Sequence, residues 1–249
     1  MDLNAYFHDE GIEIFAEVEV PTLTEKDQAY VRDFFPPAQS VIVFGREVPA
    51  SAYHSTPREQ TEVMLGIAET LNDTAIRLAE LLRSDGIPAE HIPLYLPVRI
   101  EEGRVRGVVR LKHVAAAGGL GTIGMNTLLL HPVHGPRLLL SGVVMGKGLP
   151  AESPIHPSEI SIESPSPLCI HCGRCIKACP AGAISPDGVE VFRCRTISPW
   201  VPGPFVPIAK WLIGRQMLLR CMAPIAPFIA KTATIRCSRC VTECPVFEV

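Results

Sequence analysis

The chain lacks the features that mark nucleic-acid-binding or secreted proteins. Its 249 residues carry 23 Lys and Arg against 26 Asp and Glu, a formal net charge of −3, without a basic arm or stripe. Nucleic acid is therefore not expected as the main partner. The N-terminal sequence MDLNAYFHDEGIEI has neither the basic region nor the apolar region of a secretory signal, so we predict that the chain carries none.

Long apolar runs are also missing. The most apolar stretch, WLIGRQMLLRCMAPIAPFIA at 211–230, is interrupted by Arg215, Arg220 and two prolines. A membrane-spanning helix needs about 20 almost uninterrupted apolar residues, so we predict no transmembrane segment. An amphipathic helix that packs on the protein itself is expected here, in preference to a helix lying on a membrane surface.

Cysteine is absent from the first 168 residues, whereas nine cysteines follow. This predicts an α/β domain over residues 1–150 and a metal-bearing domain over 151–249. The joint between them is GKGLPAESPIHPSEISIESPSP, which is rich in Pro, Ser and Gly. Because most of the cysteines stand in C-x-x-C spacings without a signal peptide, we expect metal ligands in the reducing cytoplasm rather than disulfides.

The first domain shows both strand and helix signals. Short apolar runs at 40–45 and 137–145 predict buried strands. Between them, Thr56 and Glu59 form a capping-box pattern that begins a helix, and Gly86 is a typical stop. The apolar face expected for this helix consists of Val63, Ile67, Leu71, Leu78 and Leu82. A helix between two strands favours a layered fold of the α/β or α+β class.

Two cysteine motifs dominate the second domain. CIHCGRCIKACP at 169–180 has the C-x2-C-x2-C-x3-C-P spacing of bacterial ferredoxins, in which the fourth cysteine binds the other cluster. RCSRCVTECP at 236–245 repeats the pattern, but Thr234 stands where its first cysteine would fall. An iron–sulfur site is favoured over a zinc site, which seldom uses this spacing. The predicted ligands are Cys169, Cys172, Cys175 and Cys244 for the first cluster, and Cys179, Cys237 and Cys240 for the second.

The second cluster therefore lacks one ligand. Cys194, in the polar sequence EVFRCRTIS, is the better candidate, because Cys221 lies in apolar MLLRCMAP and is expected to be a buried free thiol. A three-iron cluster or a non-cysteine ligand remains an alternative. His171, within the first cluster loop, is expected to tune the cluster rather than bind it.

The stretch GLGTIGMN at 119–126 contains the letters of a G-x-G-x-x-G fingerprint. A dinucleotide site would need a preceding strand and an acid about 20 residues further on. Here a helical KHVAAAG precedes it, and no acid stands near residue 144. We therefore expect a tight loop in which the backbone closely approaches a cofactor or a neighbouring strand.

The segments AAAGGLGTIGMNTLLL, SPLCIHCGRCIKACPAGAI, FRCRTIS and CSRCVTECP, in this order, resemble the epoxyqueuosine reductases. These are corrinoid-dependent iron–sulfur enzymes related to reductive dehalogenases, and the resemblance covers about residues 40–249. It implies an α+β protein in which a nitroreductase-like α/β domain carrying cobalamin precedes a ferredoxin-like module with two [4Fe-4S] clusters. It also implies that Cys194 is the eighth ligand. The loop residues that would line the cofactor are Gly119, Gly121, Gly124 and Asn126.

The chain departs from that family at several positions. Thr122 and Met125 replace a tryptophan and a lysine of the glycine segment, and the family's catalytic aspartate should fall near Val105. The nearest acids are Glu101 and Glu102. Reduction of an epoxide needs a proton donor in reach, so epoxyqueuosine reduction is not expected. The sequence given also ends four residues after the last motif's proline, without the family's C-terminal helical repeats, so tRNA is not expected as a partner.

No catalytic residue is assigned from the sequence. Candidate replacements for the missing acid are Tyr95, His113, His131 and His134, and the HPVH sequence is a weak metal-site candidate. We predict an oxidoreductase that passes low-potential electrons from a ferredoxin or flavodoxin through its clusters to a bound corrinoid and a small-molecule substrate. The alternative is an electron-transfer protein without corrinoid that reduces a partner redox protein. A flavin would suit the expected fold, but no flavin-specific residues are recognised.

Overall fold

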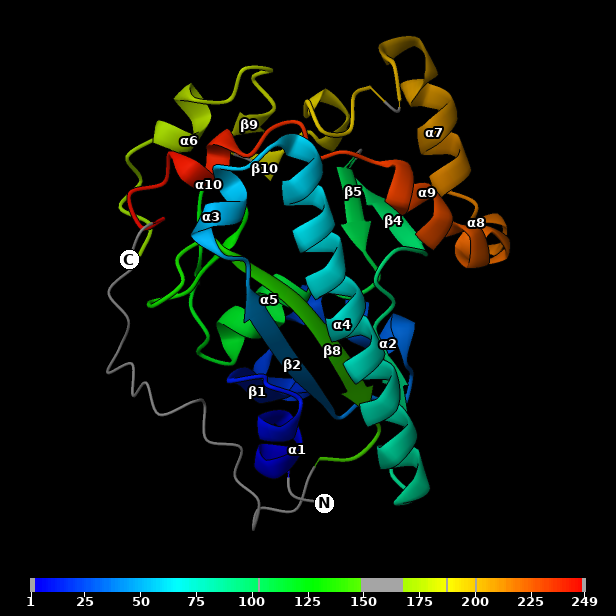
Figure 1. Cartoon of the computed structure of the whole chain (residues 1–249). Coiled ribbons are helices and arrows are strands. Elements are labelled where there is room, and N and C mark those ends of the chain that lie inside the picture. Colours follow the sequence, from blue (N-terminus) through cyan, green and yellow to red (C-terminus); the bar gives the residue numbers. More distant parts are fainter. Residues whose placement is uncertain (1–2, 103, 149–167, 187, 200, 248–249) are drawn as a thin grey trace.

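The protein is known from a computed structural model (Figure 1), which describes residues 3–102, 104–148, 168–186, 188–199 and 201–247. The predicted joint at 146–167 lies almost wholly outside the described residues. The division into domains 1–150 and 151–249 therefore stays a prediction.

A four-stranded antiparallel sheet forms the centre of the first part of the chain, the described residues up to 148. Its strand order is β1-β2-β8-β3. Their bounds are β1 Ile14–Glu19, β2 Ser40–Glu47, β8 Leu138–Met145 and β3 Ala89–His91. The two predicted strands are confirmed as β2 and β8, and they pair directly. An antiparallel sheet flanked by helices makes the fold α+β and gives no parallel-strand crevice for a dinucleotide.

Both faces of the sheet are buried, because helices cover each of them (Figure 1). Val41 and Val43 of β2 pack on one side with helices α2 and α5, whereas Ile42 and Phe44 pack on the other with α1 and α4. This two-residue alternation explains why β2 is a continuous apolar run rather than an alternating one. The helix bounds are α1 Leu3–Asp9, α2 Glu25–Phe34, α3 Ala50–Tyr53, α4 Pro57–Ser84 and α5 Leu111–Ala117.

The long helix α4 begins as predicted. The side chain of Thr56 accepts a hydrogen bond from the Glu59 amide, and the Glu59 carboxylate accepts one from the Thr56 amide at 2.9 Å. Its predicted apolar face is confirmed at Leu71 but is wrong at Val63, which is 39% exposed. In the first turns of α4 the buried side chains are instead those of Gln60 and Thr61. They form hydrogen bonds with Ser238 and Ile235 of the cysteine-bearing part, the described residues from 168 to 247.

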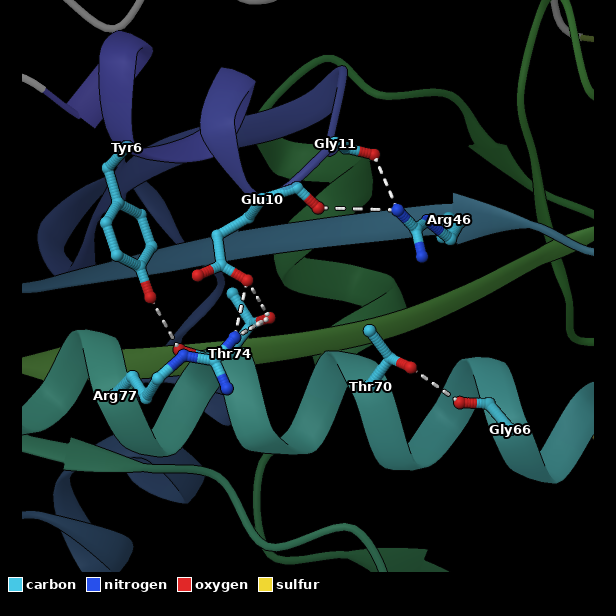
Figure 2. A network of polar contacts seen from close by, with 8 residues as sticks. All are labelled: Tyr6, Glu10, Gly11, Arg46, Gly66, Thr70, Thr74 and Arg77. Atoms are coloured by element: carbon cyan, nitrogen blue, oxygen red, sulfur yellow. Dashed lines mark hydrogen bonds and ion pairs between the residues drawn. The ribbon is translucent and has the colours of Figure 1, made fainter.

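Polar contacts hold the N-terminal helix onto α4 (Figure 2). The Tyr6 hydroxyl donates to the Thr74 carbonyl at 3.1 Å, and Glu10 binds both Arg77 and the Thr74 hydroxyl. The Arg46 guanidinium of β2 donates to the carbonyl of Gly11. These contacts fix α1 across one face of the sheet and leave the opposite end of α4 to meet the cysteine-bearing part.

Short hairpins and helices make up the rest of the chain. Hairpin β4–β5 spans Val98–Glu101 and Arg104–Gly107, and hairpin β6–β7 spans Thr122–Ile123 and Leu129–Leu130. The cysteine-bearing part contains α6 Arg174–Lys177, β9 Ile184–Ser185, β10 Gly188–Val189, α7 Val206–Ile213, α8 Gln216–Met222, α9 Ala226–Thr232 and α10 Arg239–Thr242.

The apolar stretch 211–230 does not form the single amphipathic helix that was expected. Gly214 ends α7, and prolines at 224 and 227 divide the remainder into α8 and α9. This stretch packs on the protein only in part. Leu219 is buried and α7 and α8 contact β4, whereas Trp211, Met217 and Phe228 are between 57% and 80% exposed. Among the described residues, no helix has the length and apolar character needed to cross a membrane.

The C-terminal residues 235–247 lie against the first part. The Ile235 amide donates to the Thr61 hydroxyl at 2.8 Å, and the Gln60 side-chain amide exchanges two hydrogen bonds with the Ser238 hydroxyl. Further along, Arg137 donates to the Phe247 carbonyl at 2.8 Å. The second cysteine motif is therefore held in place by α4 and by the turn before β8.

Candidate functional site

The first group of cysteines surrounds one small cavity. Cys175 is buried on α6, and burial raises the pKa of its thiol. The nearby Cys244, Cys169 and Cys172 raise that pKa further, because a neighbouring thiolate disfavours a second negative charge. All four cysteines line the same cavity, together with the glycine-loop residue Asn126.

The second group forms around Cys240 of α10. Burial raises the pKa of Cys240 to about 11, with further contributions from Cys194, Cys237 and Cys179. The pKa of Cys179 lies below its usual value. Burial acts to raise it, but hydrogen bonds from backbone N–H groups stabilise the thiolate and together lower the pKa by more. One of these N–H groups, that of Ala183, donates to the Cys179 sulfur at 3.2 Å.

Eight of the nine described cysteines therefore fall into two groups of four, the partition that the motif spacing predicts with Cys194 as the eighth member. Cys221 is exposed on α8, so the expectation that it is a buried thiol is wrong. It is also not among the groups that shift the pKa of Cys240. The assignment of individual ligands stays a prediction.

Four thiols per group is the donor set of a [4Fe-4S] cluster, in which each iron takes one cysteine. Within the described ranges, no three His, Cys, Asp or Glu side chains converge as they would around a single metal ion. A cubane does not need such convergence, because its four irons occupy separate corners. The raised pKa values of Cys175 and Cys240 mean that cluster binding must release protons from these thiols.

The glycine segment forms the hairpin β6–β7, not a strand-to-helix turn. Gly121 has φ of +150°, and a Cβ at this position would overlap the Leu130 carbonyl oxygen. The close approach expected at Gly121 is therefore to a neighbouring strand. Asn126 is buried and donates to the Cys240 carbonyl at 3.0 Å, so it contacts the second group while lining the cavity of the first.

A larger pocket of about 680 Å³ lies on the other side of this loop. Its walls come from β5, the start of α5, the loop between β6 and β7, the start of β8 and the β9–β10 hairpin. Gly124 and Met125 line both this pocket and the cysteine cavity, whereas Gly119 and Gly121 are not among the described wall residues of either. The loop thus separates the first cysteine group from the pocket.

Basic side chains gather on the pocket wall. Arg106, Arg110 and Lys112 line it, but no Asp or Glu of the described ranges does. The Nε of Arg106 is buried without a hydrogen-bond partner among the described residues. Val105, where the resemblance places an aspartate, is itself a wall residue. The pocket therefore suits an uncharged or anionic ligand.

Only one of the four candidate proton donors reaches this pocket. His113 lines it, and burial and the nearby Arg110 lower the pKa of its imidazole. Arg110 lies 2.8 Å from Nε2 of His113, which suits a neutral ring that accepts there. Tyr95, His131 and His134 are not among the described wall residues.

His131 and His134 form a turn, as Pro132 predicts. Nδ1 of His131 accepts the amides of Val133 and His134, and the two rings stack with centroids 4.9 Å apart. Nδ1 of His134 lies 3.0 Å from the carboxylate of Glu47. These partners explain both imidazoles as parts of a structural turn.

Several wall residues were not predicted from the sequence. Arg106 and Arg110 belong to the sequence RVRGVVRLKH at 104–113. Its closely spaced basic residues are the sequence signal that could have indicated a basic pocket wall. Leu138, Leu139 and Leu140 are recognisable only as strand residues. Their place in the pocket depends on the pairing of β8, which a single sequence does not reveal.

Comparison with known proteins agrees with this geometry. Residues 168–247 match the 4Fe-4S dicluster domain family. An epoxyqueuosine reductase of Synechococcus sp. is 36% identical over 104 residues, 40% of this chain. The chain is a homologue of the epoxyqueuosine reductases. A Listeria monocytogenes epoxyqueuosine reductase is 26% identical to this homologue over 184 residues, 72% of the chain. A crystal structure of an epoxyqueuosine reductase with an epoxyqueuosine-modified tRNA-Tyr stem loop covers 99% of it, with a TM-score of 0.58 and 16% identity.

The homologue spans only part of these proteins. The matched segments are 30% and 44% of the lengths of the two curated relatives, and the chain covers 64% of the solved reductase. The structural likeness gives the fold, and the sequence matches give an iron–sulfur protein related to oxidoreductases.

Proposed function

We propose that the protein is an iron–sulfur reductase that passes low-potential electrons through two [4Fe-4S] clusters to a corrinoid and a small-molecule substrate in the large pocket. One observation carries this proposal: Gly124 and Met125 line both the first cysteine cavity and the pocket. A single loop is therefore all that separates the proposed first cluster from the proposed reaction site. Such a short separation favours electron delivery from one to the other.

The lining of the pocket supports the proposal of a corrinoid. Its apolar wall includes Leu129, Leu138 and Met125, on which a flat macrocycle could rest, and its basic residues suit amide or phosphate groups at the macrocycle's edge. The unpartnered Nε of Arg106 supplies a buried donor for one of them. When bound, a corrinoid would supply a strongly reducing metal centre that amino-acid side chains cannot provide.

Electrons would enter at the second cluster. Exposed arginines flank its cysteines on both sides, and they are Arg193, Arg195, Arg236 and Arg239. A cytoplasmic donor such as ferredoxin or flavodoxin would dock here through an acidic surface. The proposed substrate is a small molecule rather than epoxyqueuosine in tRNA, because Val105 occupies the wall where the family places its acid.

The decisive experiment is to measure iron and cobalt per chain after anaerobic purification with cobalamin supplied. About eight irons with one cobalt supports the proposal. Arg106→Ala should then lower bound cobalt without lowering iron, because Arg106 lines the pocket and not the cysteine cavity. Lys147→Ala, on a residue that lines neither, is the matched control.

Two other results would change the conclusion. About eight irons without cobalt would leave an electron-transfer protein that reduces a partner. About four irons would show that one group of cysteines does not hold a cluster.

A further inference from the structure

Exposed apolar side chains concentrate on α7, α8 and α9, which lie together at one corner of the molecule (Figure 1). The described residues include twelve exposed large hydrophobic side chains, and eight of them belong to this corner. They are Phe205, Ile208, Trp211, Met217, Leu218, Ile225, Phe228 and Ile229, which we call the apolar corner. Clusters of this kind on a protein surface mark an interaction site.

The charge of this region is of one sign. Residues 191–242 contain eight Lys and Arg and no Asp or Glu, whereas the rest of the chain holds 15 Lys and Arg against 26 Asp and Glu. Within the apolar corner, Arg215 stacks on the Trp211 ring at 4.3 Å, and Arg220 is exposed on α8. Between Phe205 and Ile229 the apolar corner carries three basic residues, Lys210, Arg215 and Arg220, and no Asp or Glu, so it complements an anionic surface.

The amino-acid composition of residues 203–231 helps to decide between two anionic partners, an acidic protein and a lipid surface. Over residues 203–231, Gln216 is the only Ser, Thr, Asn, Gln or Tyr. A protein interface carries about one hydrogen bond per 100–200 Å², and this segment offers it donors on Lys, Arg and Trp side chains but, apart from Gln216, no uncharged polar or acidic side chain that could accept one. A lipid surface calls only for apolar side chains that enter the acyl boundary and basic side chains that reach the headgroups. Helices of seven or eight residues are too short to span a bilayer but can lie along it.

We propose that the apolar corner binds the surface of an anionic lipid bilayer. Trp211, Met217 and Phe228 enter the boundary between headgroups and acyl chains, while Arg215 and Arg220 reach the anionic headgroups. Helices α7 and α8 contact β4, and its hairpin partner β5 borders the large pocket. A chain seated in this way places the pocket wall close to the lipid surface. The proposal rests on exposure and charge, and does not depend on the proposed reductase function.

The test is flotation of the purified, cluster-loaded full chain with vesicles of phosphatidylcholine, with and without phosphatidylglycerol. We expect the protein to float only with phosphatidylglycerol vesicles, and less as salt is added. The double variant Met217→Gln/Phe228→Gln should bind at least about tenfold more weakly, and Arg220→Gln about fivefold. The matched controls are Val63→Gln/Leu81→Gln, which are exposed apolar residues of α4, and Arg58→Gln. These should bind as the wild type does.

Iron content and thermal unfolding show that each variant is folded, so weaker binding by M217Q/F228Q reports on the surface itself. Failure of the wild-type chain to float with anionic vesicles would overturn the proposal. A dimer that M217Q/F228Q separates, without vesicle binding, would assign the apolar corner to a second copy of this chain. Binding to an acidic protein that the same variant abolishes, again without vesicle binding, would assign it to a protein partner.

Discussion

Cys194 and Cys221 are both outside the two motifs, and their surroundings separate them. The amide of Cys194 donates to the Val191 carbonyl at 3.0 Å, and its carbonyl accepts from the Ile197 amide at 2.9 Å. These bonds hold Cys194 in a turn beside Cys240, whose pKa it raises. Cys221 instead faces solvent on α8. Of the two, only Cys194 is among the groups that raise the pKa of Cys240, so it is the better candidate for the eighth ligand.

Cys194→Ala should therefore lose the second cluster and keep the first, so iron per chain should fall from about eight to about four. Cys221→Ala is the matched control and should keep the full iron content. Iron analysis and electron paramagnetic resonance of the reduced protein would show both results. Equal iron loss in the two variants would contradict the assignment.

The buried His131 predicts how stability depends on pH. Burial lowers its pKa from 6.5 to about 4, and protonation of Nδ1 would break the hydrogen bonds from the amides of Val133 and His134. A lowered histidine pKa favours the folded state above the unfolded value of 6.5. That contribution, up to about 3 kcal/mol, is lost as pH falls from 6.5 towards 4.

His131→Asn keeps an acceptor in this turn but cannot titrate. The free energy of unfolding, measured with urea at a series of pH values, should fall less steeply below pH 6.5 in this variant than in the wild type. His8→Gln, at an 89% exposed side chain, should leave the wild-type slope unchanged. Parallel curves for H131N and the wild type would show that His131 does not contribute.

At the scale of elements, the signals that the sequence revealed are local. The capping box of Thr56 and Glu59 and the apolar runs of β2 and β8 depend on neighbouring residues alone, and all three predictions are confirmed. The exposure of Val63 could not be predicted in this way, because it depends on which part of the fold meets the first turns of α4. Likewise, the exposure of α7–α9 depends on how those helices pack, which their composition alone does not determine.

Two glycines in different elements should respond oppositely to alanine. Gly66 lies within α4 (Figure 2). Nothing lies within 4 Å of the position that a Cβ would take there, so Gly66→Ala should stabilise the fold by about 0.5–1 kcal/mol. Gly135 has φ of +54°, and a Cβ there would overlap the Val246 carbonyl oxygen. Gly135→Ala should therefore destabilise it by about 1–3 kcal/mol.

Urea unfolding of the anaerobic holoprotein would measure both effects, and Gly66→Ala serves as the control for Gly135→Ala. Because Val246 follows the predicted ligand Cys244, Gly135→Ala should also lower iron content. Unchanged stability and iron in that variant would mean that the C-terminal segment can move away from Gly135 without cost.

For the whole molecule, the important relation is between the sheet and the cysteine-bearing part. The C-terminal segment 235–247 carries three predicted ligands, and its hydrogen bonds go to α4, to Asn126 and to Arg137 of the first part. Sequence motifs predict the ligands, but they could not predict this docking, because each contact joins residues more than a hundred positions apart. The docking places the glycine loop between the first cysteine group and the pocket.

Removal of the clusters should therefore loosen this segment without unfolding the sheet. After oxidation and chelation of the iron, the rate of amide hydrogen exchange should rise at Ile235 and Phe247. Without the predicted clusters, only the hydrogen bonds to Thr61 and Arg137 would hold these two residues against the first part. Val43 and Val143 should keep their protection, because their buried sheet contains none of the predicted ligands. Equal acceleration at all four sites would show that clusters and sheet unfold as one unit. No change at Ile235 would show instead that the hydrogen bonds to α4 hold the segment without iron.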